Sequence, residues 1–149
     1  MQISNRFSIG VHILVLVARQ NEEDILTSET LAGSVAVNPV IVRKVMSQLR
    51  QADLIQTKQG MAGMELGRQP EEITLFDIYQ ATGGIGADKL FRYHDMPNPQ
   101  CEVGRTIHGV LDYHLDEVKT AMEAPLKQQT LADILETSQG KIDSRENQS

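Results

Sequence analysis

The side chains best suited to chemistry in this sequence lie between residues 38 and 58. Asp53 is the single acid in this stretch, against the cations Arg43, Lys44, Arg50 and Lys58, a balance of +3. In a DNA groove, Arg forms bidentate contacts with guanine and Asn with adenine, and Lys neutralises phosphate. Asn38, Arg43 and Lys44 therefore favour contact with DNA, although an ordinary solvated helix with surface cations would carry the same residues.

The charge of the whole chain has the opposite sign. The net charge is −6, but residues 1–69 hold seven Lys/Arg and six Asp/Glu, whereas residues 70–149 hold seven and fourteen. The first part thus carries +1 and the second −7. We expect the acidic part to face away from phosphates.

Composition predicts one domain with an oligomerisation arm. The 149 residues are 40% hydrophobic but only 4% aromatic, which indicates an aliphatic core. No apolar run reaches the ~18 residues of a membrane span, and the N-terminus lacks the order of a signal peptide. The single Cys101 excludes an internal disulfide. These features predict a cytoplasmic protein without a membrane partner.

Two helices are expected to support the cationic stretch. Apolar residues recur at helical spacing over residues 3–19, where Ser4 or Asn5 is the expected N-cap. Thr27 or Ser28 begins a second helix, which is expected to turn an apolar face inward.

A third helix is expected to present the cations. The break Val37-Asn38-Pro39 combines an N-cap with Pro at the first helical position, so a helix restarts there and runs to residue 54. Short strands at residues 54–58 and 64–66, joined by a Gly-containing turn, follow it. Together these elements predict a winged helix-turn-helix over residues 1–84, a mainly α fold with a small β-wing.

The second half of the chain is predicted to make a dimer. Residues 85–100 are expected to be a linker, and residues 102–122 a helix ~30 Å long, more than a small winged helix can cover. This helix is expected to cross the same helix of a second copy in antiparallel fashion. A short helix at 130–135 is expected to dock on that pair, which makes residues 101–137 the dimerisation unit. Residues 138–149 are expected to be disordered. The apolar stripe predicted to make the dimer consists of Val103, Ile107, Val110, Leu111, His114, Leu115, Val118 and Met122.

Four segments carry a resemblance to a known family. They read TSETLAGSVAVNPVIVRKVMSQLRQADLI, EEITLFDIYQAT, LFRYHDMPNPQCEVGRTIHGVLDYHLDEV and TLADIL. In this order, with a Gly-containing wing between the first two, they resemble the BadM/Rrf-type family of winged-helix transcription regulators. Within that family they resemble the YwnA-like branch, which lacks the iron–sulfur cysteines. The match runs from Ser4 to about Leu135.

The resemblance implies a homodimer on a palindromic operator of double-stranded DNA. The resemblance also implies the residues that contact DNA, namely Ser4, Arg6, Thr27, Ser28, Asn38, Pro39, Val40, Arg43, Lys44, Lys58 and Gln59. Ser47 is added to these because it lies on the same outer face of the third helix. The wing departs from the family, whose wings are often richer in glycine than this one with Gly60 and Gly63. Asp53 also stands where a glycine commonly closes the recognition helix, although Asp tolerates left-handed φ better than most residues.

Cys101 is the residue that the sequence offers as a candidate sensor of a regulatory signal. Some members of the resembled family hold an iron–sulfur cluster through three cysteines about six residues apart, but here the partners at that spacing are Asp95 and Ile107, so no cluster is expected. His94, Asp95, Cys101 and His108 lack the paired spacing of a zinc site, so no metal or other cofactor is predicted. At the start of the long helix, Cys101 has either a packing role or the role of a redox-sensing thiol.

The sequence favours a DNA-binding transcription regulator, acting as a repressor, over two other classes of function. One is a protein-interaction module that binds a metabolic enzyme and keeps a vestigial winged helix, although such a module would have little reason to hold +3 on residues 38–58. The other is an enzyme, which is not expected because the chain has no nucleophile motif or phosphate loop. Gly83-Gly84-Ile85-Gly86 is not a cofactor fingerprint.

Overall fold

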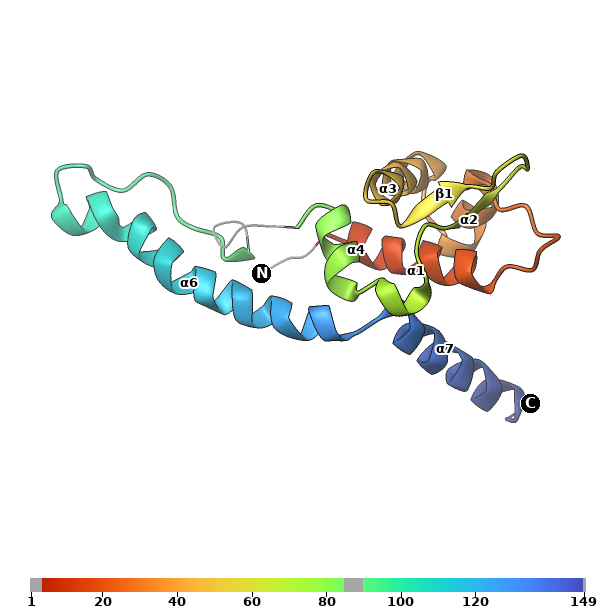
Figure 1. The fold of residues 1–149 in the computed structure, drawn as a ribbon. Coiled ribbons are helices and arrows are strands. Elements are labelled where there is room, and N and C mark those ends of the chain that lie inside the picture. The colour runs from red at the N-terminus through yellow and green to blue at the C-terminus, as the bar shows by residue number, and fades with distance from the viewer. Residues whose placement is uncertain (1–3, 85–89, 149) are drawn as a thin grey trace.

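The computed structural model describes residues 4–84 and 90–148 of the chain. A winged-helix body is built from the first four helices and a two-stranded antiparallel sheet, and helix α6 extends from it as an arm (Figure 1). This arrangement confirms the predicted mainly α fold with a small β-wing. Among residues 4–84 and 90–148, none of the helices combines the length and the apolar character of a membrane-spanning segment. The elements are α1 Arg6–Arg19, α2 Ser28–Val35, α3 Pro39–Gln51, β1 Ile55–Thr57, β2 Met64–Leu66, η1 Pro70–Glu72, α4 Leu75–Ala81, α6 Glu102–Gln128 and α7 Leu131–Glu146.

The core of the body is aliphatic and centres on α1, which contacts α2, α3, α4, α7 and β2. A Cβ built on Gly10 of α1 would lie 3.1 Å from a methyl group of Thr82, so this glycine lets α1 and the end of α4 approach closely. The side chains with no exposed surface are Ile13, Leu14, Leu31, Val42, Val45, Leu49, Leu54, Ile73, Ile78 and Leu131.

Side-chain caps decide where the helices begin. Thr27, Thr74 and Thr130 each occupy an N-cap and form a reciprocal capping box with the residue three positions later, which satisfies N–H groups at the helix start. At α1, Asn5 holds the N-cap position without a side-chain cap, and the Ser4 hydroxyl accepts from the Arg6 N–H at 3.2 Å instead. Residue 3, where this helix was predicted to begin, lies outside the described residues.

The tail predicted to be disordered is helical as far as Glu146. The short docking helix expected at 130–135 is the first part of α7, so the boundary at residue 138 was wrong. Ile134, Ser138 and Ile142 recur every four residues and are partly buried on one side of the helix. The signal was weak because Gly140 and several polar residues interrupt the apolar pattern.

The arm is also longer than predicted, since α6 runs past Met122 to Gln128. Pro125 cannot donate a backbone hydrogen bond, yet the helix continues through it. Lys127 Nζ is 4.6 Å from the centre of the Phe76 ring, and Glu123 is buried. Leu75 N–H then donates to the Gln129 carbonyl at 2.9 Å, which ties the end of α6 to the body.

Residues 90–100, the described part of the predicted linker, contact the first turns of α6. Leu90 is buried. The rings of Tyr93 and His94 have their centres 5.3 and 5.0 Å from the ring of His108 in α6. The segment therefore supports the far end of the arm, and residues 85–89 lie outside the described residues.

Ala36 closes α2 in the left-handed conformation, at φ +60°. Because this conformation costs a non-glycine residue about 1 kcal/mol or more, Ala36→Gly is expected to raise the free energy of unfolding by roughly 0.5–1 kcal/mol, measured by urea denaturation. Ala124→Gly is the control, since Ala124 is exposed within helix α6; it is expected to lower stability by up to about 1 kcal/mol. Equal losses from both changes would contradict strain at Ala36.

Candidate nucleic-acid interface

Helix α3 has one face in the core and the other in solvent. Val42, Val45 and Leu49 on its inner face have no exposed surface. Val40, Lys44 and Ser47 follow one another at spacings of four and three residues, so they share one face, and all are exposed. Contacts with α1 and α2 hold the inner face, and α3 lies at the outer side of the body (Figure 1).

The start of α3 is set by Asn38 and Pro39. The Asn38 side-chain oxygen accepts from the Val40 N–H at 2.8 Å, and Pro39 occupies the first turn, where its missing N–H costs nothing. A bidentate contact with adenine would require the same amide oxygen. In this conformation Asn38 therefore positions α3 rather than making a bidentate contact with adenine.

The end of α3 is a left-handed turn at Asp53, whose φ is +59°. Asp53 N–H donates to the Arg50 carbonyl and Leu54 N–H to the Leu49 carbonyl, each at 3.0 Å, which is the hydrogen-bond pattern of a Schellman motif. A Cβ on Gly67 would collide with the Asp53 carbonyl oxygen. Aspartate thus serves where glycine was expected, and Gly67 allows β2 to end beside the turn.

The wing is a short antiparallel ribbon in which Ile55 pairs with Leu66 and Thr57 with Met64. Gly60 and Gly63 adopt positive φ of +71° and +105° in the turn between the strands. These two glycines therefore suffice to close the wing.

Lys58 braces the wing rather than extending from its tip. Its Nζ donates to the Asp24 carbonyl at 3.4 Å. On the same side, Gln20 Nε2 donates to the Met64 carbonyl at 2.6 Å. Gln20 has no sequence signal for this role because its partner lies 44 residues away. Gln59 is the exposed polar residue at the tip.

Arg43 lies on the flank of α3 that faces α2, with its guanidinium 3.9 Å from the Glu29 carboxylate. Backbone N–H at the start of α2 holds the pKa of Glu29 below its usual range, the Ser28 hydroxyl at 3.1 Å adds to this effect, and Arg43 contributes least. Both partners are more than half exposed, so the ion pair is weak. Arg43 can therefore leave Glu29 for another anion at little cost. Sequence reasoning missed Glu29, because its spacing from Arg43 carries no signal.

The predicted DNA-contact residues differ in exposure. Arg6, Ser28 and Lys58 are half-buried. The exposed ones are Ser4, Thr27, Asn38, Pro39, Val40, Arg43, Lys44, Ser47 and Gln59. The α3 residues lie together on one surface, whereas the Ser4 and Thr27 oxygens already accept backbone N–H groups at the starts of α1 and α2.

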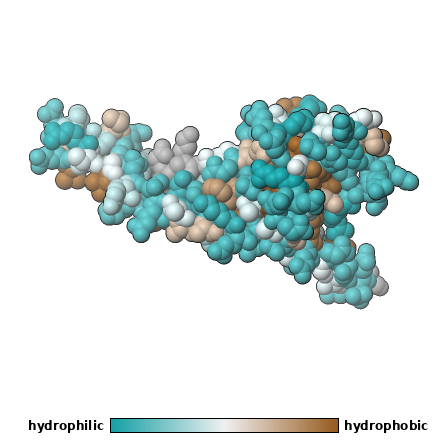
Figure 2. All heavy atoms as spheres, in the orientation of Figure 1, coloured by the Kyte–Doolittle hydropathy of each residue, from teal (hydrophilic) through white to brown (hydrophobic). Residues whose placement is uncertain are grey.

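The predicted dimer stripe on α6 is only partly covered within the chain. Val103 is 67% exposed, and Val110 and Val118 are each 47% exposed. His114 is also exposed, and Ile107, Leu111, Leu115 and Met122 are half-buried. Apolar patches are visible along the arm within a mostly hydrophilic surface (Figure 2).

Cys101 occupies the N-cap of α6, as the sequence predicted, and is exposed. The Gly104 N–H points to its sulfur at 3.5 Å. No second residue of the described segments makes this thiol a defined site, so its sensing role stays a prediction.

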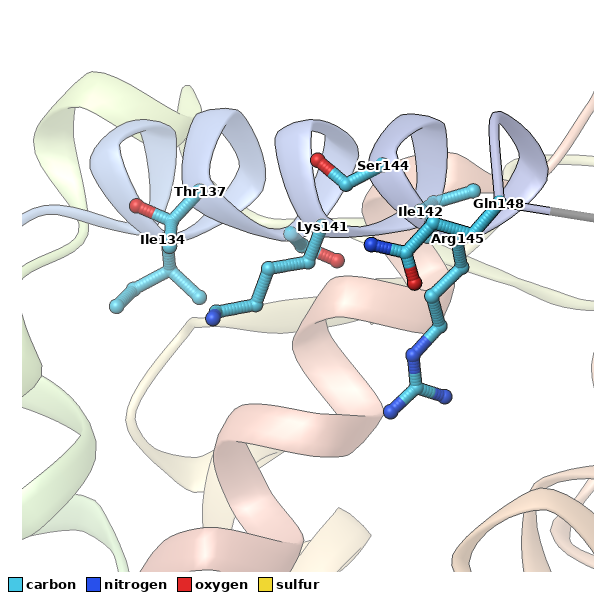
Figure 3. Close-up of a pocket in the computed structure, with 8 residues that line it drawn as sticks. Ile134, Thr137, Lys141, Ile142, Ser144, Arg145 and Gln148 are labelled. Carbon is cyan, nitrogen blue, oxygen red and sulfur yellow. The ribbon is translucent and has the colours of Figure 1, made fainter.

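A groove of about 700 Å³ lies along α7 (Figure 3). It is lined by Ile134, Thr137, Ser138, Lys141, Ile142, Ser144, Arg145 and Gln148. All of these belong to one helix and its end, so the groove has no opposing wall among its lining residues. It is separate from the α3 surface, and we assign no ligand to it.

A helix with its polar side exposed, preceded by a supporting helix and followed by a β-ribbon, defines a winged helix-turn-helix protein. The chain matches the model of the Rrf2 family, described as iron-dependent transcriptional regulators, over residues 3–137. It belongs to this family of DNA-binding winged-helix transcription regulators.

Individual relatives agree with this membership. The chain is 35% identical to Bacillus subtilis (strain 168) YwnA, named as an HTH-type transcriptional regulator, over 89% of this chain and 96% of YwnA. A solved structure described as a DNA-binding protein has 32% identity and a TM-score of 0.69, covering 87% of this chain and 98% of that one. A transcriptional regulator from Lactobacillus plantarum shares the fold at 22% identity, with a TM-score of 0.74 over 94% of this chain and 98% of that one.

The residues of this chain do not fit the iron that the family description mentions. Clusters generally need about four ligands, mostly thiolates, and Cys101 is the single cysteine. Within residues 4–84 and 90–148, no group of three or more His, Cys, Asp and Glu side chains could hold a metal ion. No step of a mechanism is therefore assigned to iron.

Asn38→Ala is expected to lower the free energy of unfolding by about 1 kcal/mol, because the first N–H groups of α3 lose their side-chain acceptor. Asn38→Ser is the matched control, since the serine oxygen can accept the same hydrogen bond. Its free energy of unfolding is expected to fall by only a few tenths of the decrease caused by Asn38→Ala. Urea denaturation of both variants measures the difference. Equal losses would show that the cap hydrogen bond does not hold the start of α3.

Proposed function

We propose that this protein is a sequence-specific repressor that binds a palindromic operator as a homodimer, in the cytoplasm. The observation that carries the proposal is the outer face of α3, where Val40, Lys44 and Ser47 are exposed directly opposite the fully buried Val42, Val45 and Leu49. Because the core holds the inner face, the outer face is presented in a fixed orientation. This is the arrangement by which a recognition helix enters the major groove.

Charge supports the same surface. Residues 38–58 carry +3 within a chain of net charge −6, so phosphates are attracted locally while the acidic remainder limits binding elsewhere. Lys44 lies on the outer face and Arg43 on its flank, from which it reaches Glu29 only at 3.9 Å. A DNA phosphate or base edge can replace this weakly held carboxylate.

The arm supports the homodimer. Its partly exposed apolar stripe lies on a different side of the helix from the buried Glu123 and from Lys127, which lies over the Phe76 ring of α4. At 1.5 Å per residue, the 27 residues of α6 extend about 40 Å. A second copy of α6 would cover the stripe and place two α3 helices on one duplex.

The operator experiment is a gel shift with DNA from upstream of the protein's own gene. Specific binding is expected at 50 mM salt and is expected to weaken by at least tenfold at 200 mM as counterions are released. Arg43→Ala should cost about 1–3 kcal/mol and relax preference at one base position. The control is Arg92→Ala, an exposed arginine outside the winged helix, which should leave binding unchanged.

Two other outcomes of the gel shift would change the proposal. A loss from Arg43→Ala that is uniform over all sequences would make Arg43 a phosphate contact. Absence of any specific shift, in reducing and oxidising buffer alike, would reject the regulator and favour the protein-interaction module.

The dimer is tested by introducing charged residues into the apolar stripe of α6. Val110→Glu combined with Val118→Glu is expected to convert a dimer to a monomer in light scattering and to weaken operator binding by more than tenfold, because two carboxylates would be buried at the interface. Thr120→Glu adds a carboxylate at an exposed position off the stripe, and it should leave the dimer intact. A wild-type monomer at micromolar concentration would contradict the homodimer.

A further inference from the structure

Val40 is 61% exposed, more than Ile41, the other exposed large hydrophobic side chain on α3. A single exposed valine is common on protein surfaces, but the position of this one is specific. It lies in the leading turn of the helix, four residues before Lys44 and seven before Ser47, on the side directly away from the core. On the proposed reading face, this is the position closest to the helix N-terminus.

The groups around Val40 leave an apolar surface at the tip of α3. The Asn38 oxygen is occupied by the Val40 N–H at 2.8 Å, and Pro39 has no N–H and presents an exposed ring. Lys44 supplies positive charge one turn further along the same face. The tip therefore offers the methyl groups of Val40 beside the Asn38 amide, flanked by the charge of Lys44, which attracts a polyanion.

A β-branched side chain gives this surface a fixed shape. In a helix, valine has one strongly preferred rotamer, so the two methyl groups of Val40 point in a defined direction once α3 is seated. In the major groove, the apolar feature that distinguishes one base from the others is the 5-methyl group of thymine.

We infer that Val40 recognises thymine in each operator half-site by packing its methyl groups on the thymine 5-methyl group. This inference rests on the proposed function. It assigns to α3 an apolar contact with thymine beside the contact proposed for Arg43. Cytosine at the same position would lack the methyl group and leave Val40 without a partner.

The test removes only the methyl group. In an operator duplex located by footprinting, each thymine is replaced singly by deoxyuridine, and dissociation constants are measured for the wild type, Val40→Ala and Ile41→Ala. At one thymine per half-site, the wild type is expected to lose roughly fourfold in affinity, since one buried CH₂ contributes about 0.8 kcal/mol. Val40→Ala is expected to bind the thymine and deoxyuridine duplexes equally at that position.

Ile41→Ala is the matched control, because Ile41 is 40% exposed on the neighbouring flank of the same turn, and this variant should keep the wild-type response. The inference is overturned if no thymine is sensitive in the wild type, if Val40→Ala keeps the response, or if Ile41→Ala abolishes it. The wild-type measurement depends on no variant. Absence of specific DNA binding would instead reject the proposed function.

Discussion

The burial of one face of α3 is the constraint on which the rest of the structure depends. Val42, Val45 and Leu49 have no exposed surface, so rotation of α3 about its axis would expose apolar side chains at a cost of roughly 1.5–3 kcal/mol each. This cost fixes which residues face outward. The same helix is thus both part of the core and the candidate reading element.

The two ends of α3 are fixed by local hydrogen bonding and backbone conformation. Asn38 caps the first turn, and the left-handed Asp53 ends the last one. Because the Asn38 oxygen is used in the cap, the exposed Val40 side chain is the main apolar group at the tip of the helix. A structural requirement at the helix start therefore decides what chemistry the tip can offer to DNA.

The arm and the body differ in how far they bury their apolar side chains. The body buries its aliphatic side chains within one chain, whereas α6 leaves valines 47% to 67% exposed along its length. Its base is nonetheless firmly attached, through Lys127 on the Phe76 ring and the hydrogen bond from Leu75 to Gln129. These contacts join the base of the arm to the body that carries α3.

The sequence by itself determined the fold class, the Asn38–Pro39 restart and the amphipathic character of α3 and α6. These features depend on local rules of periodicity and capping, which operate within a few residues. Sequence also located the positive charge on residues 38–58. It missed the full length of α7, because Gly140 and neighbouring polar residues hide a periodicity that is visible once the helix is formed.

Tertiary structure alone decided which of the candidate side chains are free. Lys58 was a candidate for the wing tip, but it bonds to Asp24 at 34 residues' separation. Gln20 supports the wing and Glu29 lies beside Arg43, and neither had a signal in the sequence. These contacts join segments that are distant along the chain, so their partners are set by how α1, α2 and the wing pack together rather than by local residue order.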